Sequence, residues 1–265
     1  RPLIRYYSKI GGRWLSNEKL RVAIIGCGSL GQVYAKFYSS LSNVKIVALA
    51  ERNPDRLKHV GKQYNIRHLY PDADALFSDM TPDIAVVVTP SKFYMDSVIA
   101  AAEAGVRGVS TDKPLEATLS NADAMVEACA KRGVIFSGGA LIKATPEIQE
   151  TASWIHKGKL GKLIGAAVLD WSREISGAGC HAISVLRLLT GAEVEEVVAW
   201  GTPSDLLAAD CDWNLVVNGH FKLSNGLNCP VFGDRWRFLE IQRMFIISVT
   251  NSLNISACGA KISKS

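Results

Sequence analysis

The sequence predicts an α/β fold, in which an N-terminal Rossmann domain with a doubly wound parallel sheet precedes an α+β domain with an open mixed or antiparallel sheet. Three observations predict it. An apolar strand runs directly into the turn G-C-G-S-L-G at residues 26–31. A second strand, V-K-I-V-A-L-A, follows and ends at the acid Glu51. Strand and helix patterns then alternate to about residue 140, and β patterns dominate toward the end of the chain.

Composition indicates a globular protein that can bury a substantial core. The chain has 265 residues, of which 48% are hydrophobic and 21% charged, and its formal net charge is +5. Because the positive charge is spread along the sequence, it does not indicate a nucleic-acid surface. No apolar run approaches the roughly 20 residues that cross a bilayer. We therefore expect a soluble protein with no nucleic-acid or membrane partner.

The cysteines and the first residues bear on the compartment. None of the six cysteines forms a C-x-x-C pair, so we expect reduced thiols in a cytoplasmic protein. Before Glu18 the chain carries four basic residues and no acid, a bias that an organelle-targeting segment would also produce. We expect residues 1–19 to form a disordered or loosely docked leader instead.

Residues 20–140 are expected to form the Rossmann domain. After the second strand, Asn53 and Pro54 are typical of the cap and the first position of a helix, which we expect to run to about Tyr64. Gly105 and Gly133 each follow a helical pattern, where a left-handed residue ends many helices. The other elements expected here are strands at Ile84–Thr89, Gly108–Thr111 and Val134–Ser137, with helices at Met95–Ala104 and Ser120–Lys131.

Residues 141–265 are expected to form the α+β domain. A helix should begin at Thr145 and Pro146 and stop at Gly158, and a second should cover His181–Leu189 and end at Gly191. From Asn254 onward the chain shows little strand or helix character. Strands are expected at Leu163–Asp170 and in the runs V-E-E-V-V-A-W, W-N-L-V-V-N-G-H-F-K-L, R-W-R-F-L-E-I and F-I-I-S-V.

The turn at residues 26–31 has the spacing of a pyrophosphate-binding loop. Gly26 permits the tight turn out of the strand, Gly28 lets the backbone approach the phosphates, and Gly31 lets the next helix pack closely on the sheet. N–H groups at the start of that helix then face the anion. The alternative is a glycine turn that merely connects a strand to a helix, but here strand, helix, strand and acid follow in order. The residues expected to complete the loop are Cys27, Ser29 and Leu30.

The charges that end the second strand bear on the choice of cofactor. Glu51 can accept hydrogen bonds from both ribose hydroxyls and would repel a 2′-phosphate. Arg52, its neighbour, could attract that phosphate by turning toward it. We expect NAD as the cofactor, with NADP as the alternative.

Two turns after later strands carry further candidate site residues. In T-D-K-P-L-E at 111–116, the Lys113 ammonium could stabilise an alkoxide as hydride leaves, with Pro114 fixing the backbone that aims it. The alternative for Lys113 is a solvated lysine in a turn. Thr89 and Pro90 end the neighbouring strand and could floor a nicotinamide pocket, although taken alone they are only a strand-ending turn.

These motifs together resemble the glucose-fructose oxidoreductase, inositol dehydrogenase and rhizopine-catabolism (Gfo/Idh/MocA) family. The resemblance implies an N-terminal Rossmann domain and a C-terminal domain whose open sheet supports the substrate site and homo-oligomer contacts. It also implies reversible NAD(P)-linked oxidation of a small-molecule sugar or polyol. The motifs run from about residue 20 to about 226: G-C-G-S-L-G, A-L-A-E-R-N-P-D-R, V-V-T-P-S, T-D-K-P-L-E, K-A-T-P, H-K-G-K-L-G and G-C-H-A-I-S-V-L-R-L-L-T-G.

The resemblance assigns roles to two residues. Lys113 matches the lysine of the family's E-K-P motif, although Asp112 replaces the usual glutamate. His181 matches the catalytic histidine, whose imidazole would accept the hydroxyl proton as hydride departs. Without the resemblance, a histidine at the start of an apolar helix would be read as a buried packing residue.

The chain also departs from the family pattern. Gly177 and Ser184 stand where family members commonly carry aspartates near the histidine, Tyr94 where many have a histidine, and Lys143 where many have an arginine. The segment from residue 170 to 181 is short, and the domain is expected to be shortened at its C-terminus. These departures support a second hypothesis, a dinucleotide-binding protein with little or no catalytic activity.

No metal site is expected. The five histidines lie far apart, and none forms an i, i+4 pair or a cluster with cysteine: His59, His68, His156, His181 and His220.

Overall fold

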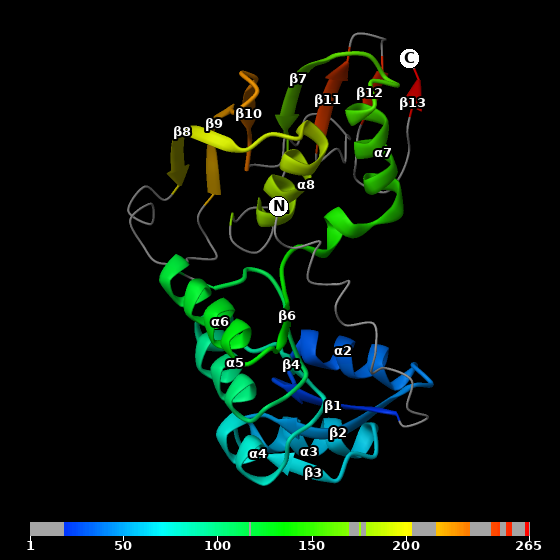
Figure 1. The fold of residues 1–265 in the computed structure, drawn as a ribbon, viewed down its shortest axis with the longest axis vertical. Coiled ribbons are helices and arrows are strands. Elements are labelled where there is room, and N and C mark those ends of the chain that lie inside the picture. Colours follow the sequence, from blue (N-terminus) through cyan, green and yellow to red (C-terminus); the bar gives the residue numbers. More distant parts are fainter. Residues whose placement is uncertain are drawn as a thin grey trace. The chain divides into compact units, whose positions relative to one another are not determined.

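The computed structural model describes residues 19–116, 118–169, 175, 179–202 and 216–233, and the backbone alone of 245–249, 253–255 and 263–264. The chain divides into two compact units (Figure 1). Unit 1 ends at Thr111 and resumes over Thr118–Ser137, and unit 2 comprises Asp112–Ala117 and the residues from Gly138 onward. The expected leader lies outside the described residues, apart from Lys19.

Unit 1 is a Rossmann fold. Its six strands lie in the order β3-β2-β1-β4-β5-β6, and every pair is parallel. This order is that of a doubly wound sheet, so the predicted fold class is confirmed. The strands are β1 (Leu20–Ile25), β2 (Val44–Ala50), β3 (His68–Tyr70), β4 (Ile84–Val87), β5 (Gly108–Thr111) and β6 (Ile135–Ser137). The helices are α2 (Ser29–Ser39), α3 (Pro54–Gln63), α4 (Ala73–Asp79), η1 (Ser91–Phe93), α5 (Tyr94–Glu103) and α6 (Leu119–Lys131).

Local signals in the sequence account for most of these boundaries. The Asn53 side chain accepts hydrogen bonds from the N–H groups of Asp55 (3.1 Å) and Arg56 (2.9 Å), and therefore caps α3 as predicted. Gly105 and Gly133 follow α5 and α6 at φ +80° and +67°, in the left-handed conformation expected of them. The sequence analysis did not anticipate β3 and α4, because a three-residue strand and a seven-residue helix carry too little periodicity.

Unit 2 is the predicted α+β unit with a mixed sheet. Seven strands lie in the order β13-β12-β11-β7-β10-β9-β8, in which β7 and β10 are parallel and the other pairs antiparallel. The strands are β7 (Leu163–Val168), β8 (Val194–Thr202), β9 (Val216–Leu223), β10 (Asn228–Val231), β11 (Phe245–Val249), β12 (Leu253–Ile255) and β13 (Ser263–Lys264). The helices are η2 (Leu141–Ala144), α7 (Pro146–His156) and α8 (Cys180–Thr190).

Two strand predictions in unit 2 need comment. The tail from Asn254 was expected to lack strand character, and this is wrong because β12 pairs with both β11 and β13. Backbone pairing along a sheet stabilises these short segments, which their own composition does not favour. The strand expected in R-W-R-F-L-E-I lies outside the described residues.

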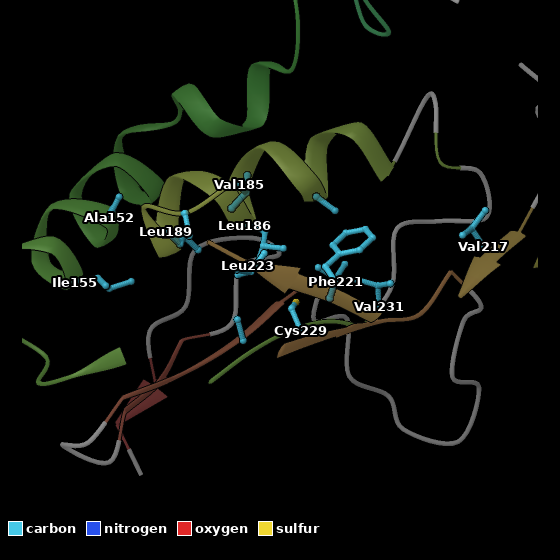
Figure 2. Close-up of a cluster of buried hydrophobic side chains, with 14 residues drawn as sticks. Ala152, Ile155, Val185, Leu186, Leu189, Val217, Phe221, Leu223, Cys229 and Val231 are labelled. Carbon is cyan, nitrogen blue, oxygen red and sulfur yellow. The ribbon is translucent and has the colours of Figure 1, made fainter. Parts of the chain in front are cut away.

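The core of unit 2 forms where α8 packs on the sheet (Figure 2). Ala182, Val185, Leu186 and Leu189 recur at helical spacing along α8 and are all buried. In β9 every second residue is buried, which is the alternation expected of a strand with one covered face. This packing fixes the orientation of α8 and therefore of the residues at its N-terminal end.

No helix in the described part of the chain is both long and apolar enough to span a bilayer.

Replacing Leu186 by alanine should destabilise the protein by about 2–5 kcal/mol, because the change removes buried methyl groups and leaves a cavity. Leu186 is 0% exposed, whereas Leu141 of the same unit is 76% exposed. Leu141→Ala is therefore the matched control, with an expected change within about 0.5 kcal/mol. Urea denaturation of both variants measures the difference, and equal effects would contradict the assigned core.

Candidate functional site

The glycine turn after β1 has a geometry that only glycine satisfies at two of its three glycine positions. Gly26 adopts φ +99°, and a Cβ there would lie 2.7 Å from the Val88 carbonyl oxygen. A Cβ on Gly31 would lie 2.0 Å from the Gly26 carbonyl oxygen, closer than any real contact. The first and third glycines are thus required by the close packing of β1, β4 and α2.

Gly28 differs from the other two glycines. Its φ is −65°, which any residue can adopt, and a Cβ built on it meets no atom within 4 Å. The fold itself therefore does not require glycine at position 28. Because Gly28 has no Cβ, the space beside its backbone stays open, and a diphosphate needs such a space to approach the backbone closely.

The N-terminus of α2 is suited to an anion. Gly28 is the N-cap, no side chain caps the helix, and its first turn contains no acid. Side chains of Asn53, Asp72 and Thr118 cap α3, α4 and α6, whereas α5, α7 and α8 lack a side-chain cap, as α2 does. The first N–H groups of α2 are thus left for a ligand, and the helix dipole favours a negative one. Ser29 and Leu30, in this first turn, are both exposed.

Glu51, directly after β2, is held against the glycine turn. Its Oε2 accepts a hydrogen bond from the Cys27 N–H (2.8 Å), and its Oε1 accepts one from the Asn53 N–H (2.9 Å). Arg56 lies 3.4 Å from Oε1. Burial alone would raise the pKa of Glu51, but these hydrogen bonds and the Arg56 charge outweigh it and lower the pKa. The ionised carboxylate keeps lone pairs that can accept from ribose hydroxyls.

The other predicted cofactor residues of unit 1 lie at the same edge of the sheet. Cys27 is 1% exposed; burial, together with the neighbouring Glu51, raises the pKa of its thiol to about 12. Its N–H is already donated to Glu51, so Cys27 would serve the site through that bond. Thr89 and Pro90 follow β4, which pairs with β1, and are half-buried and exposed respectively.

Arg52 has a definite position. Its guanidinium carbon lies 4.9 Å from the centre of the Phe93 ring. The Lys92 ammonium lies 5.2 Å from the centre of the same ring. Arg52 is exposed, and contact with the ring face stabilises a cation there. Glu51 and Arg52 are thus neighbours in sequence that point to different partners. The Glu51 carboxylate binds the glycine turn, and the Arg52 guanidinium stacks on Phe93 of η1.

Unit 2 brings together the two residues to which the family resemblance assigns catalysis. Lys113 and Pro114, joined by a cis peptide bond, lie in the segment Asp112–Ala117, and His181 lies in the first turn of α8. Burial lowers the pKa of His181, the positive charge of Lys113 lowers it further, and the negative charge of Asp112 opposes them. The ammonium and the imidazole are therefore electrostatic neighbours.

The imidazole of His181 has an unusual environment. Its Nδ1 is buried and has no hydrogen-bond partner among the described residues. Ser184, one turn later, is half-buried, and Gly177 lies outside the described residues. The structure also shows Asp112 as the acid whose charge acts on His181, a role that the sequence analysis missed. The signal was its position beside Lys113 in T-D-K-P.

Several other residues that the motifs singled out are also placed. Tyr94 is buried at the start of α5, and Lys143 is exposed in η2. Within the described ranges no group of three or more His, Cys, Asp or Glu residues is arranged to hold a metal ion. The four described cysteines are free thiols: Cys27, Cys129, Cys180 and Cys229.

Comparison with known proteins gives concordant matches. The family model GFO_IDH_MocA, described as "Oxidoreductase family, NAD-binding Rossmann fold", matches residues 20–140. D-apiose dehydrogenase of Paraburkholderia graminis is 31% identical over 144 residues, 54% of this chain and 38% of that protein. scyllo-Inositol 2-dehydrogenase (NAD(+)) of Bacillus subtilis is 27% identical over 198 residues, 69% of this chain and 58% of that protein. The chain thus spans about two fifths to three fifths of the length of these relatives.

Solved structures agree on the fold. The crystal structure of myo-inositol 2-dehydrogenase from Lactobacillus plantarum aligns with a TM-score of 0.74 at 20% identity, over 88% of this chain and 75% of that one. At this identity the likeness supports the fold alone. Residues 20–140 match the model of the Gfo/Idh/MocA oxidoreductase family, whose description names an NAD-binding Rossmann fold, and the structural likeness agrees with that match on the fold.

Proposed function

We propose that this chain is an NAD-dependent dehydrogenase that transfers hydride between the nicotinamide and a hydroxyl-bearing carbon of a sugar or polyol. The observation that carries the proposal is the placement of Lys113, in the segment Asp112–Ala117, in the same unit as His181 in the first turn of α8, where the positive charge of Lys113 lowers the pKa of His181. Two residues far apart in sequence, each singled out by its own motif, are electrostatic neighbours inside unit 2. A base beside a fixed cation is the arrangement that oxidation of an alcohol requires.

His181 would act as the general base. Burial and the Lys113 charge favour the neutral imidazole, so the base is unprotonated at neutral pH and ready to accept a hydroxyl proton. Lys113 would donate a hydrogen bond to the same substrate oxygen and stabilise the negative charge that develops on it. The missing aspartates near the histidine do not prevent this, since Asp112 supplies a compensating charge once His181 is protonated.

Unit 1 would hold the cofactor, which accepts the hydride when it is bound. The α2 N-terminus and the open Gly28 position suit the diphosphate, and the ionised Glu51 suits the ribose hydroxyls. Glu51 supports NAD over NADP, because a 2′-phosphate beside its carboxylate would be repelled. Arg52, the residue that could favour NADP, is stacked on Phe93.

The substrate class rests on the relatives. Those named above act on D-apiose and scyllo-inositol by their names, and another, from Escherichia coli, is a D-glucoside 3-dehydrogenase. All three names describe oxidation of a polyhydroxylated small molecule. Sugars and polyols are thus the substrate class we propose for this chain.

Self-association and a cytoplasmic location complete the proposal. In β8, the edge strand of the unit 2 sheet, three large apolar side chains are at least half exposed: Val197, Val198 and Trp200. An exposed apolar strand at a sheet edge favours pairing with a second copy of the chain. Free buried thiols suit a reducing compartment.

Gly28→Ala should leave the melting temperature unchanged, because the added Cβ contacts no protein atom. It should weaken NADH binding by about tenfold or more, because the Cβ enters the space proposed for the diphosphate. Gly31→Ala should lower stability by about 1–3 kcal/mol, because its Cβ collides with the Gly26 carbonyl. Thermal unfolding and calorimetric titration with NADH and NADPH measure both effects. Unchanged NADH affinity in Gly28→Ala, or tighter NADPH than NADH binding in the parent, would contradict the cofactor assignment.

The pKa of His181 should move in opposite directions in two charge variants. Lys113→Met removes a positive neighbour and should raise the pKa, whereas Asp112→Asn removes a negative one and should lower it further. In the parent the pKa is below its ordinary value, so the neutral base persists to lower pH than in a free histidine. NMR titration of the imidazole signals, assigned with His181→Asn, gives the three values. If neither variant changes the pKa of His181, the proposed electrostatic interaction between Lys113 and His181 is contradicted.

The parent protein should reduce NAD with at least one member of a panel of inositols, aldoses and amino sugars. His181→Asn and Lys113→Ala should lower kcat/KM by about 10²- to 10⁴-fold while the Kd for NADH stays unchanged. His59→Asn, an exposed histidine on α3, is the matched control and should retain full activity. Tight NADH binding with no turnover on any substrate would favour the second hypothesis, a dinucleotide-binding protein without catalysis.

A further inference from the structure

A cleft of about 530 Å³ lies at the amino-terminal edge of the unit 1 sheet, the edge opposite the glycine turn. Arg21 near the start of β1, Lys45 near the start of β2 and His68 at the start of β3 all line it. Since parallel strands begin at the same edge, these side chains gather there. The cleft lies wholly within unit 1, and its volume is that of sites that bind small organic molecules.

The polar side of the cleft is cationic. Arg21, Lys45 and Arg67 carry positive charge, and no acid lines the cleft in the part of the chain that the structure describes. Lys45 and Arg67 form no ion pair or hydrogen bond with the described residues. The Arg21 guanidinium donates to the Thr81 carbonyl (2.8 Å), which orients the group without neutralising it.

The sheet register places two of these charges side by side. Arg21 is paired directly with Lys45 across β1 and β2, and residues paired in this way project to the same face. Like charges at paired positions are unfavourable unless something compensates them. A bound anion would compensate them, because it would accept hydrogen bonds from both side chains.

The backbone around the cleft is shaped by two irregularities. The register of β1 and β2 shifts after Val22, so that Val47 has no partner, and such bulges are rare between parallel strands. Asn65, in the turn that leads to β3, has φ +54°. Val47 and Asn65 both line the cleft, and the remaining wall is apolar, with Ile46, Ile66 and Met80.

From this combination we infer that the cleft is a second ligand site, distinct from the dinucleotide site, for a small organic polyanion such as a phosphomonoester or a tricarboxylate. Arg21, Lys45 and Arg67 bind the anionic groups, and the apolar wall contacts the carbon skeleton. The relevant chemistry is charge-assisted hydrogen bonding by a preformed cluster of cations.

Calorimetric titration of the full chain tests the site, with glucose 6-phosphate and citrate as probes and glucose as the uncharged control. At least one anionic probe should bind and glucose should not. Lys45→Gln and Arg67→Gln should each weaken binding by about tenfold, since each removes one charged donor. Lys58→Gln, an exposed lysine on α3 outside the cleft, should change affinity by less than about twofold. The probe that binds identifies the anion class.

Gly28→Ala separates this site from the dinucleotide site. A probe in the cleft should bind this variant as it binds the parent, whether or not the chain is a dehydrogenase. The inference is overturned if neither anion binds, if Lys58→Gln weakens binding as much as Lys45→Gln, or if Gly28→Ala abolishes it. Binding of duplex DNA or anionic vesicles without either small anion would also overturn it. Equal melting temperatures of the variants ensure that the comparison concerns binding alone.

Discussion

The hydrogen bond from the Cys27 N–H to the Glu51 carboxylate joins the glycine turn to the end of β2. The second oxygen of the same carboxylate accepts from Asn53, whose side chain caps α3. One half-buried acid thereby fixes the turn after β1, the end of β2 and the start of α3 relative to one another. The cost of burying a carboxylate is offset by these bonds and by Arg56, and the result is a negative charge held in place before any ribose arrives.

The catalytic assignment depends on packing in a similar way. The apolar face of α8 formed by Ala182, Val185, Leu186 and Leu189 is buried in the core of unit 2, so rotation of the helix would expose these residues. His181, in the first turn of that helix, is therefore held where the charges of Lys113 and Asp112 act on it. The segment Asp112–Ala117 follows a strand of unit 1 in sequence yet belongs to unit 2 by its contacts. This short segment thus places the Lys113 cation in the same unit as His181, where its charge acts on the imidazole.

The sequence predicted what is encoded locally. Asn53 and Pro54 predict the start of α3, and the apolar spacing from Ala182 to Leu189 predicts α8. Both signals arise within one or two turns of the chain. Relations between distant segments were not predictable in the same way. Asp112 as a partner of His181, Cys27 as a donor to Glu51, and the strand β12 all depend on which segments meet in three dimensions. The resemblance to a known family supplied Lys113 and His181, which local sequence alone would have left as a turn lysine and a packing histidine.

The two edges of the unit 1 sheet are linked by strands that reach both. β1 begins beside Arg21 and ends at the glycine turn, and β2 begins beside Lys45 and ends at Glu51. Between those ends Val22, Ile24 and Leu49 are fully buried, so the middle of both strands is closely packed in the core of unit 1. The bulge at Val47 is the irregular point along this path. The proposed anion cleft and the glycine turn therefore lie at opposite ends of the same two strands.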